Sequence, residues 1–119
     1  MTTQQIAAKL VDYSRTGDFE TAQRELFAQD AISIEPYATP EFEKETKGLA
    51  AIFEKGRKFM DMSEEIFGIE ISEPLIATNS FAVSLKMDMS MKGQGRMNMT
   101  ELCVYEVKDG KIISERFYV

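Results

Sequence analysis

The sequence of 119 residues contains no histidine and no tryptophan, and it has one cysteine, Cys103. Without histidine, no catalytic triad or dyad can use an imidazole base, and the commonest ligand of zinc and iron is missing. A single cysteine permits no internal disulfide bond. Acid–base chemistry must therefore come from Asp, Glu, Tyr, Lys or Cys, and the sequence predicts neither a metal site nor a bound cofactor.

Long apolar runs are also absent. No stretch of about 18 apolar residues could span a membrane, and residues 1–9 lack the basic and apolar regions of a signal peptide. We therefore expect a cytoplasmic protein. The formal net charge of −6 disfavours binding to nucleic acid or to a membrane surface. The nearest approach to a basic cluster is Lys55, Arg57 and Lys58, which we interpret as a solvated helix face.

The first half of the chain carries the three-and-four spacing of amphipathic helices. One helix includes Ile6 and Leu10 and is expected to stop at Gly17, because glycine accepts the left-handed conformation of a helix C-cap. Asp18 is expected to cap a second helix with its carboxylate. The longest helix is predicted to follow Gly48. Between the last two helices we expect a short strand over residues 31–35 and a surface loop over residues 41–47.

After about Glu64 the apolar period changes to two, which predicts strands. The runs begin with Phe67, Ile69 and Ile71, continue over 81–91 and 97–107, and end with 112–119 after a tight turn at 108–111. Residues of like parity share one face of a strand. One face is therefore apolar, with methionines at 87, 89, 91, 97 and 99. The sequence predicts a single α+β domain with helices packed on one face of a bent antiparallel sheet around an apolar pocket.

Four segments occur in an order that resembles the nuclear-transport-factor-2-like (NTF2-like) superfamily, and within it the SnoaL-like and ketosteroid-isomerase-like proteins. They are T-G-D-F at 16–19, L-F-A-Q-D-A-I-S-I-E-P at 26–36, K-G-L-A-A-I at 47–52 and V-Y-E-V-K-D-G-K-I at 104–112. The resemblance covers essentially the whole chain. It implies a cone-shaped sheet, a pocket between the third and first helices, and homodimers that pack sheet against sheet.

The resemblance leaves two functions open, because this fold hosts several unrelated activities. The first is a cofactor-independent isomerase or dehydratase that acts on an apolar carbonyl compound. The second is a non-catalytic ligand-binding or dimerisation module. In both cases the expected partner is a small apolar or amphipathic molecule.

Two glutamates are the candidate catalytic residues. In the resembling isomerases, the acid before the proline at 36 is the general base, and Glu35 occupies that position. The alternative is a strand-end carboxylate that binds nearby backbone. Glu101 shares the parity of Met99 and Cys103, and an ionised acid on an apolar face is costly. Glu101 therefore either faces a pocket or is turned outward by a bulge. The resemblance implies a polar or acidic group on this strand, where a neutral acid can donate to a developing oxyanion.

Further residues are candidates for contact with a ligand. Tyr13 on the first helix either places its phenol in the cavity or belongs to the core, whereas the catalytic tyrosine of the isomerases would align nearer Leu10. Glu115 shares the parity of Ile113. Many SnoaL-like proteins carry a functional Asp beyond the last strand, where this sequence ends at Val119. The other predicted lining residues are apolar, aromatic or thiol: Phe53, Met87, Met99, Cys103, Tyr105 and Phe117.

Overall fold

Three helices form the first layer of the computed structural model, which describes all 119 residues. They are α1 (Thr3–Arg15), α2 (Phe19–Leu26) and α3 (Leu49–Met62). Helix α1 starts with a capping box, in which Thr2 and Gln5 exchange side-chain and backbone hydrogen bonds. Gly17, with φ of 75°, follows α1 as predicted. None of the helices is long and apolar enough to cross a membrane.

The predicted Asp18 cap is wrong in its chemistry. Asp18 stands at the N-cap position of α2, but its carboxylate accepts no hydrogen bond from the helix. Its ψ of 56° lies outside the extended region that normally aims an N-cap side chain at the free amides of the first turn.

Seven strands form one sheet in the order β2-β1-β7-β6-β5-β3, and β4 pairs with β5 beside β3. Their bounds are β1 (Phe27–Ile34), β2 (Glu45–Lys47), β3 (Ser63–Ile71), β4 (Leu75–Ile76), β5 (Ser80–Met91), β6 (Gly95–Lys108) and β7 (Lys111–Tyr118). All pairs are antiparallel except β1 with β7, so the sheet is mixed rather than wholly antiparallel.

Two sequence predictions about this sheet need correction. Strand β1 begins at Phe27, before the predicted start at Ala31. Residues 45–47, predicted as part of a surface loop, form β2 and pair with Ile32–Ile34. These three residues are charged or polar, so they show none of the apolar alternation by which a strand is predicted from sequence. Strand β2 forms because its backbone hydrogen-bonds to β1.

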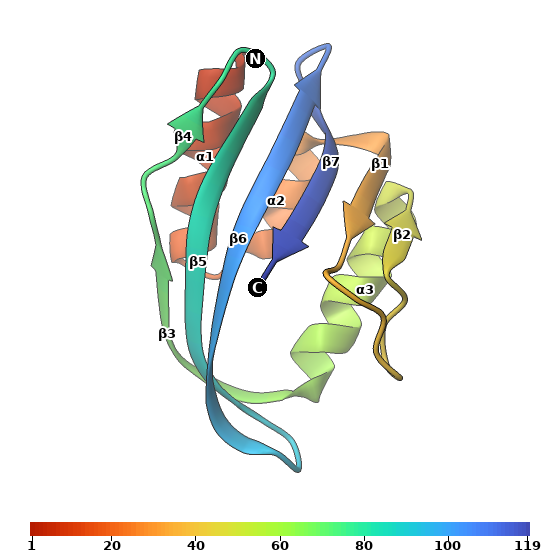
Figure 1. The fold of residues 1–119 in the computed structure, drawn as a ribbon, viewed down its shortest axis with the longest axis vertical. Helices are drawn as coiled ribbons and strands as arrows, with labels where there is room; N and C mark the ends of the chain where they lie inside the picture. Colours follow the sequence, from red (N-terminus) through yellow and green to blue (C-terminus); the bar gives the residue numbers. More distant parts are fainter.

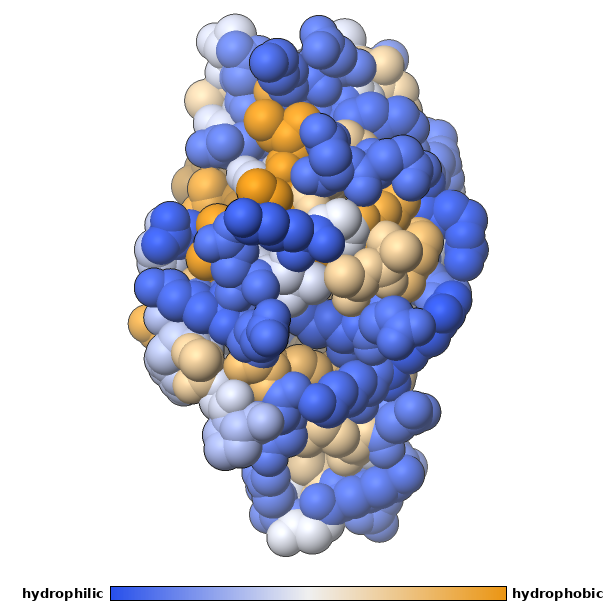
Figure 2. All heavy atoms as spheres, turned by 90° about the vertical axis from the view of Figure 1, so that its right-hand side faces the viewer, coloured by the Kyte–Doolittle hydropathy of each residue, from blue (hydrophilic) through white to orange (hydrophobic).

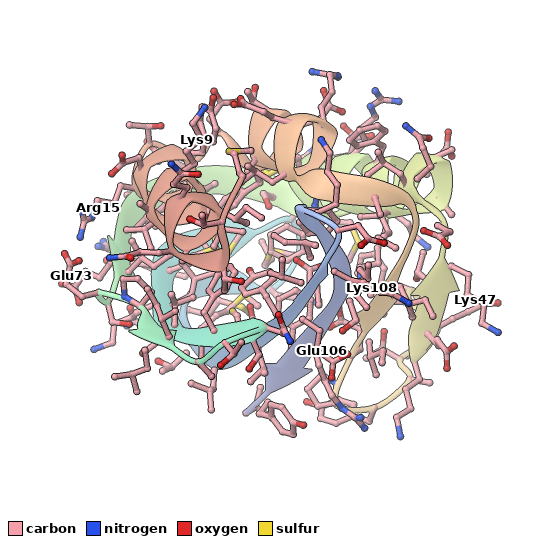
Figure 3. All side chains as sticks on the ribbon, turned by 90° about the horizontal axis from the view of Figure 1, so that it is seen from above. Lys9, Arg15, Lys47, Glu73, Glu106 and Lys108 are labelled. Carbon is pink, nitrogen blue, oxygen red and sulfur yellow. The ribbon has the colours of Figure 1, made fainter.

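The helices cover one face of the curved sheet (Figures 1 and 3). In the view from above, Lys9, Arg15, Lys47 and Glu73 extend outward at the rim, while side chains fill the space between helices and sheet. The side of the molecule that carries α3 and β2 is largely hydrophilic, with apolar residues gathered in separate patches (Figure 2). The interior between helices and sheet is therefore the main apolar volume.

The predicted methionine-rich face lies inside. Met87, Met89 and Met91 are 5%, 0% and 6% exposed, and they belong to the same core as Leu10 and Ile52 from the helices. Burying each such side chain contributes roughly 1.5–3 kcal/mol. The predicted turn between β6 and β7 is also confirmed: Asp109 and Gly110 both have positive φ, as a two-residue hairpin turn requires.

Irregular strand pairing changes which side chains of two predicted strands point into the core. Between Ile66 and Gly68 the register of β3 against β5 shifts, and Phe67 lies 45% exposed rather than inside. In β7 the register shifts opposite Glu106 and Val107, so Ile113 is an extra residue between two paired ones. As a result Ile112, and not Ile113, is fully buried, while Glu115 still points inward.

Candidate functional site

A cavity of about 650 Å³ lies between the helices and the inner face of the sheet. Its volume falls within the usual range for small-molecule sites. Helix α3, the α1–α2 junction and the segment after β1 cover it, and β5, β6 and β7 form its floor. The observed cover thus includes the segment at 36–42 in addition to the helices that the resemblance implied.

Strand pairing places the floor residues in rows. Leu85 lies opposite Glu101, and Met87 lies opposite Met99. In a further row, Tyr105 of β6 pairs with Glu115 of β7. Nine of the side chains that the sequence analysis singled out border this cavity: Glu35, Phe53, Met87, Met99, Glu101, Cys103, Tyr105, Glu115 and Phe117.

Tyr13 does not belong to this lining, and the prediction that its phenol reaches the cavity is wrong. Its hydroxyl donates to the Glu25 carboxylate on α2. The Tyr13 ring is partly buried against the core, which agrees with the alternative interpretation, and its hydroxyl reaches a half-buried acid on the neighbouring helix.

A hydrogen-bonded chain of four side chains crosses one end of the cavity; we call it the Lys55 network (Ser33, Glu35, Lys55 and Glu115). The Lys55 ammonium donates to Ser33 Oγ at 2.7 Å and to Glu35 Oε2 at 2.8 Å. The Ser33 hydroxyl in turn donates to Glu115 Oε2 at 2.7 Å. Ser33 and Glu115 face each other across the parallel β1–β7 pair, 82 residues apart in sequence.

Lys55 corrects the interpretation of the basic residues on α3 as one solvated face. Its side chain is 16% exposed and borders the cavity, whereas Arg57 and Lys58 are exposed. The spacing held the signal: Lys55 stands three residues after Ile52 and four before Phe59, on the buried stripe of the helix. Ser33 was missed as well, because one serine in a strand has no pattern that marks it.

The environment of Glu101 favours its neutral form. Burial, followed by the charges of Glu35 and Glu115, raises the pKa of Glu101 to about 7, although Lys55 acts in the opposite direction. Glu101 also accepts no hydrogen bond from a protein side chain that would stabilise its charge. Near neutral pH this group can therefore both hold and release a proton.

Glu115 is 6% exposed, and burial raises its pKa, while the Ser33 hydroxyl and the Lys55 ammonium oppose the rise. Glu35 differs because its carboxylate is paired directly with Lys55 and its side chain is 24% exposed. Three carboxyl groups thus compete for one interior ammonium. Such a site contains both a proton acceptor and a proton donor at the same pH.

The Cys103 thiol and the Tyr105 phenol are not nucleophiles in this site. Burial raises the pKa of Cys103 far above the neutral range, and burial likewise raises the pKa of Tyr105 well above 10. Tyr105 stacks on Phe81 with ring centroids 4.8 Å apart. Both side chains are neutral parts of the cavity wall. No group of three or more Cys, Asp or Glu side chains is arranged to hold a metal ion.

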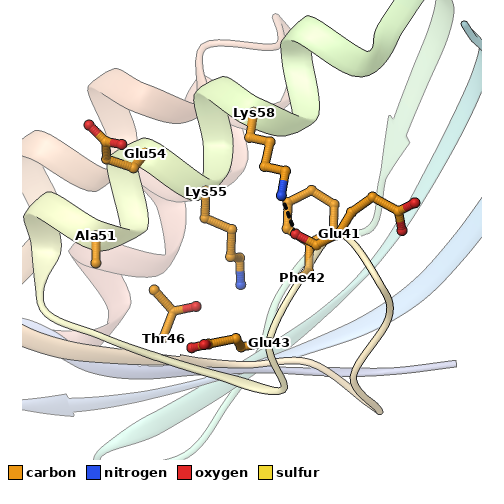
Figure 4. A pocket seen from close by; sticks show the side chains of 8 residues that line it. All are labelled: Glu41, Phe42, Glu43, Thr46, Ala51, Glu54, Lys55 and Lys58. Carbon is orange, nitrogen blue, oxygen red and sulfur yellow. Dashed lines mark hydrogen bonds between the residues drawn. The ribbon is translucent and has the colours of Figure 1, made fainter.

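A second, smaller hollow of about 240 Å³ lies outside α3 (Figure 4). In it, the Lys58 ammonium donates to the Glu41 carbonyl oxygen and lies 5.1 Å from the centre of the Phe42 ring. Lys55 and Phe42 border both this hollow and the main cavity. These contacts fix the segment after β1 against the helix and so complete the cavity wall.

Comparisons of the sequence and of the structure with known proteins agree on one family. The family model described as SnoaL-like domain matches residues 1–119. A structure from Mesorhizobium loti, provisionally assigned as a SnoaL-like polyketide cyclase, is 30% identical, with a TM-score of 0.92 and 100% coverage of both chains. No curated protein matches the chain significantly.

More distant structures share the fold. A Xanthomonas campestris protein of unknown function with a cystatin-like fold has 22% identity and a TM-score of 0.83, over 99% of this chain and 90% of that one. A Catenulispora acidiphila protein with a ketosteroid isomerase-like fold, solved with trimethylamine, has 15% identity and a TM-score of 0.74, over 99% and 87%. The predicted α+β cone is therefore confirmed.

Proposed function

The chain belongs to the SnoaL-like family, and on this premise we propose that it is a cofactor-independent isomerase or dehydratase of a small apolar carbonyl compound. One observation supports this most strongly. Glu35 and Glu101 border the same cavity, near enough for the charge of Glu35 to raise the pKa of Glu101. The pair offers an ionised base and a neutral acid to one ligand.

In the proposed reaction, Glu35 removes a proton from the carbon beside the carbonyl group. The C–H bonding electrons form the C=C bond of an enolate, and neutral Glu101 donates a hydrogen bond to its oxygen. An isomerase returns the proton to another carbon. In a dehydratase the enolate expels a β-hydroxyl group, which leaves as water with the proton that Glu35 took.

The charges around the cavity favour an uncharged ligand. Lys55 is the only cation bonded to its interior acids, and it already pairs with Glu35. Arg57, at the edge, pairs with Glu20 at 2.9 Å. An anionic ligand would add a charge next to Glu101 and Glu115, whose burial already disfavours ionisation. An apolar ketone or enone carries no such charge.

A second function, non-catalytic ligand binding, has an observation in its favour. No fully buried side-chain nitrogen or oxygen lacks a hydrogen-bond partner, and each member of the Lys55 network is hydrogen-bonded to another without a ligand. In that case the acids stabilise the wall, and the cavity only holds an apolar molecule.

Hydrogen exchange on a bound ketone separates the two functions. We suggest following the loss of the α-proton signals of 2-tetralone, an apolar bicyclic ketone, by proton NMR in heavy water. The wild-type protein should accelerate exchange, and Glu35→Gln should lower the acceleration about 100-fold or more. Glu106→Gln is the matched control, because Glu106 is exposed on the same strand as Glu101. Binding of 2-tetralone without accelerated exchange would establish the binding module instead.

We also propose a homodimer that buries the outer face of the sheet, where Leu75, Leu102 and Tyr118 are 78%, 46% and 46% exposed. Light scattering coupled to size-exclusion chromatography should give twice the mass of one chain, and Leu102→Glu should halve it. A monomeric wild-type protein would contradict the proposal. The cytoplasmic location and the absence of nucleic-acid or membrane binding stay predictions from the sequence.

A further inference from the structure

We propose that Lys55 is a catalytic residue that binds the oxygen of the ligand: its ammonium pairs with Glu35 before proton transfer and with the enolate oxygen after it. This inference rests on the function proposed above and assigns the part of that site that stabilises negative charge on oxygen. It also gives the ligand a requirement, because one carbonyl oxygen must reach the ammonium group.

The hydrogen bonds of Lys55 leave one donor for a ligand. An ammonium group has three N–H donors. Two of them are used by Ser33 Oγ and Glu35 Oε2, at 2.7 and 2.8 Å. The third has no acceptor within the chain, and the side chain borders the cavity. The nitrogen also lies 5.5 Å from the centre of the Phe117 ring, which forms the apolar wall beside it.

The arrangement keeps the charges balanced during the reaction. Before transfer, Glu35 is the anion next to Lys55. When Glu35 takes the α-proton, it becomes neutral, and the negative charge moves to the ligand oxygen. An ammonium group between the two positions then remains paired throughout, and its attraction to the ligand strengthens only as charge develops there. This is the condition under which an interaction accelerates a reaction.

Ser33 and Glu115 act as positioning residues for the ammonium. The Ser33 hydroxyl donates its hydrogen bond to Glu115, so its oxygen presents a lone pair to Lys55. Both residues are buried, at 0% and 6% exposure. They fix the nitrogen from the side of β1 and β7 and leave it accessible from the cavity.

Substitution of Lys55 tests the inference through the rate of 2-tetralone exchange. Lys55→Met should lower the acceleration about 100- to 1000-fold, as the loss of one oxyanion donor does elsewhere. Lys55→Arg should recover part of it, and Lys9→Met, whose side chain is exposed and does not border the cavity, should have no effect. Circular dichroism and the melting temperature show whether each variant is folded. Unchanged exchange in folded Lys55→Met would overturn the inference.

The pH profile tests whether the charge of Lys55 acts on the acid of the site. The charged groups that face Glu101 are Glu35 at the end of β1, Glu115 on β7 and Lys55 on α3. Because Lys55 is the only one that lowers the pKa of Glu101, removing it should favour neutral Glu101 up to a higher pH. The residual activity of Lys55→Met should therefore decline at higher pH than that of the wild type. An unshifted decline would contradict the proposal.

Binding of 4-nitrophenol tests the same inference without turnover, since its phenolate resembles an enolate in charge and shape. At one pH near neutrality, the bound compound should show more of the visible phenolate absorbance in the wild type than in Lys55→Met. An equal ionised fraction, or no binding to the wild type, would overturn the inference. If the wild type does not exchange 2-tetralone but ionises 4-nitrophenol through Lys55, the proposed reaction fails while the oxygen-binding role of Lys55 stands.

Discussion

Two side-chain networks in this molecule use the same functional groups in different surroundings. Each joins a lysine ammonium, a glutamate carboxylate and a hydroxyl group. In the α1–α2 network, Lys9 lies 2.6 Å from Glu25, and the Tyr13 hydroxyl donates to the same carboxylate. The lysine and glutamate side chains there are 49% and 34% exposed, against 16% and 24% for Lys55 and Glu35 in the Lys55 network.

The difference changes what the acids can do. Hydrogen bonds from Lys9 and Tyr13 lower the pKa of Glu25, so it stays ionised at neutral pH. In the cavity, burial has the larger effect and raises the pKa of Glu101 and Glu115. Residue type and pairing are therefore insufficient to mark a proton-transfer site. The degree of burial is what separates the two networks.

The largest expected effect concerns Glu101 and pH. Its raised pKa means that the folded state holds a proton which the unfolded chain releases between pH 4.5 and about 7. The free energy of unfolding therefore falls as the pH rises through that window, by about 3 kcal/mol in total, because each pKa unit corresponds to about 1.36 kcal/mol. Glu101→Gln should thus match the wild type near pH 4 and exceed it by about 3 kcal/mol above pH 7, in urea denaturation. A constant difference between the two proteins would contradict this.

Loss of the buried cation should come next. Lys55→Met leaves Glu35 and Glu115 without their ammonium, and we expect it to lower the free energy of unfolding by about 2–3 kcal/mol at pH 7. This lies below the range for fully buried pairs because Glu35 retains contact with solvent. Lys9→Met is the matched substitution in the exposed network and should barely change the denaturation midpoint. Equal losses in both variants would show that burial does not distinguish the networks.

The hydroxyl groups provide a smaller test. Ser33→Ala removes the donor to Glu115 and an acceptor of Lys55, both inside the protein, and should cost about 1–2 kcal/mol of unfolding free energy. Tyr13→Phe removes the corresponding donor to Glu25, but water can replace it there. Thermal denaturation of both variants at pH 7 should therefore show a clear fall in melting temperature only for Ser33→Ala.

The smallest effect should be that of Glu25→Gln, and its pH dependence should have the opposite sign to that of Glu101→Gln. Because the pKa of Glu25 is lowered in the folded state, its ionised form stabilises the protein above the ordinary glutamate range. That stabilisation is lost as the pH falls through the lowered pKa. The melting temperature of Glu25→Gln should be slightly below wild type at pH 7 and should converge with it in acid. A gap that widens in acid would contradict the sign.

Several parts of the site could be predicted from the sequence. Period two placed Glu101 on the same face as Met99 and Cys103, and the acid before Pro36 directed attention to Glu35. The partners of these acids could not be found in the same way. Ser33 meets Glu115 only because β1 pairs in parallel with β7, and no local pattern reports a pairing over 82 residues.

The sequence by itself determined the helices, the long inner face of the sheet and the position of Glu101 on it, because periodicity is a local property of the chain. Tertiary structure decided which polar groups are buried together. It turned Tyr13 toward Glu25 and brought Lys55 to Glu35 and Ser33. The reason is physical: the energy of a charge depends on its burial and on neighbours from distant strands, and both exist only after the sheet has closed under the helices.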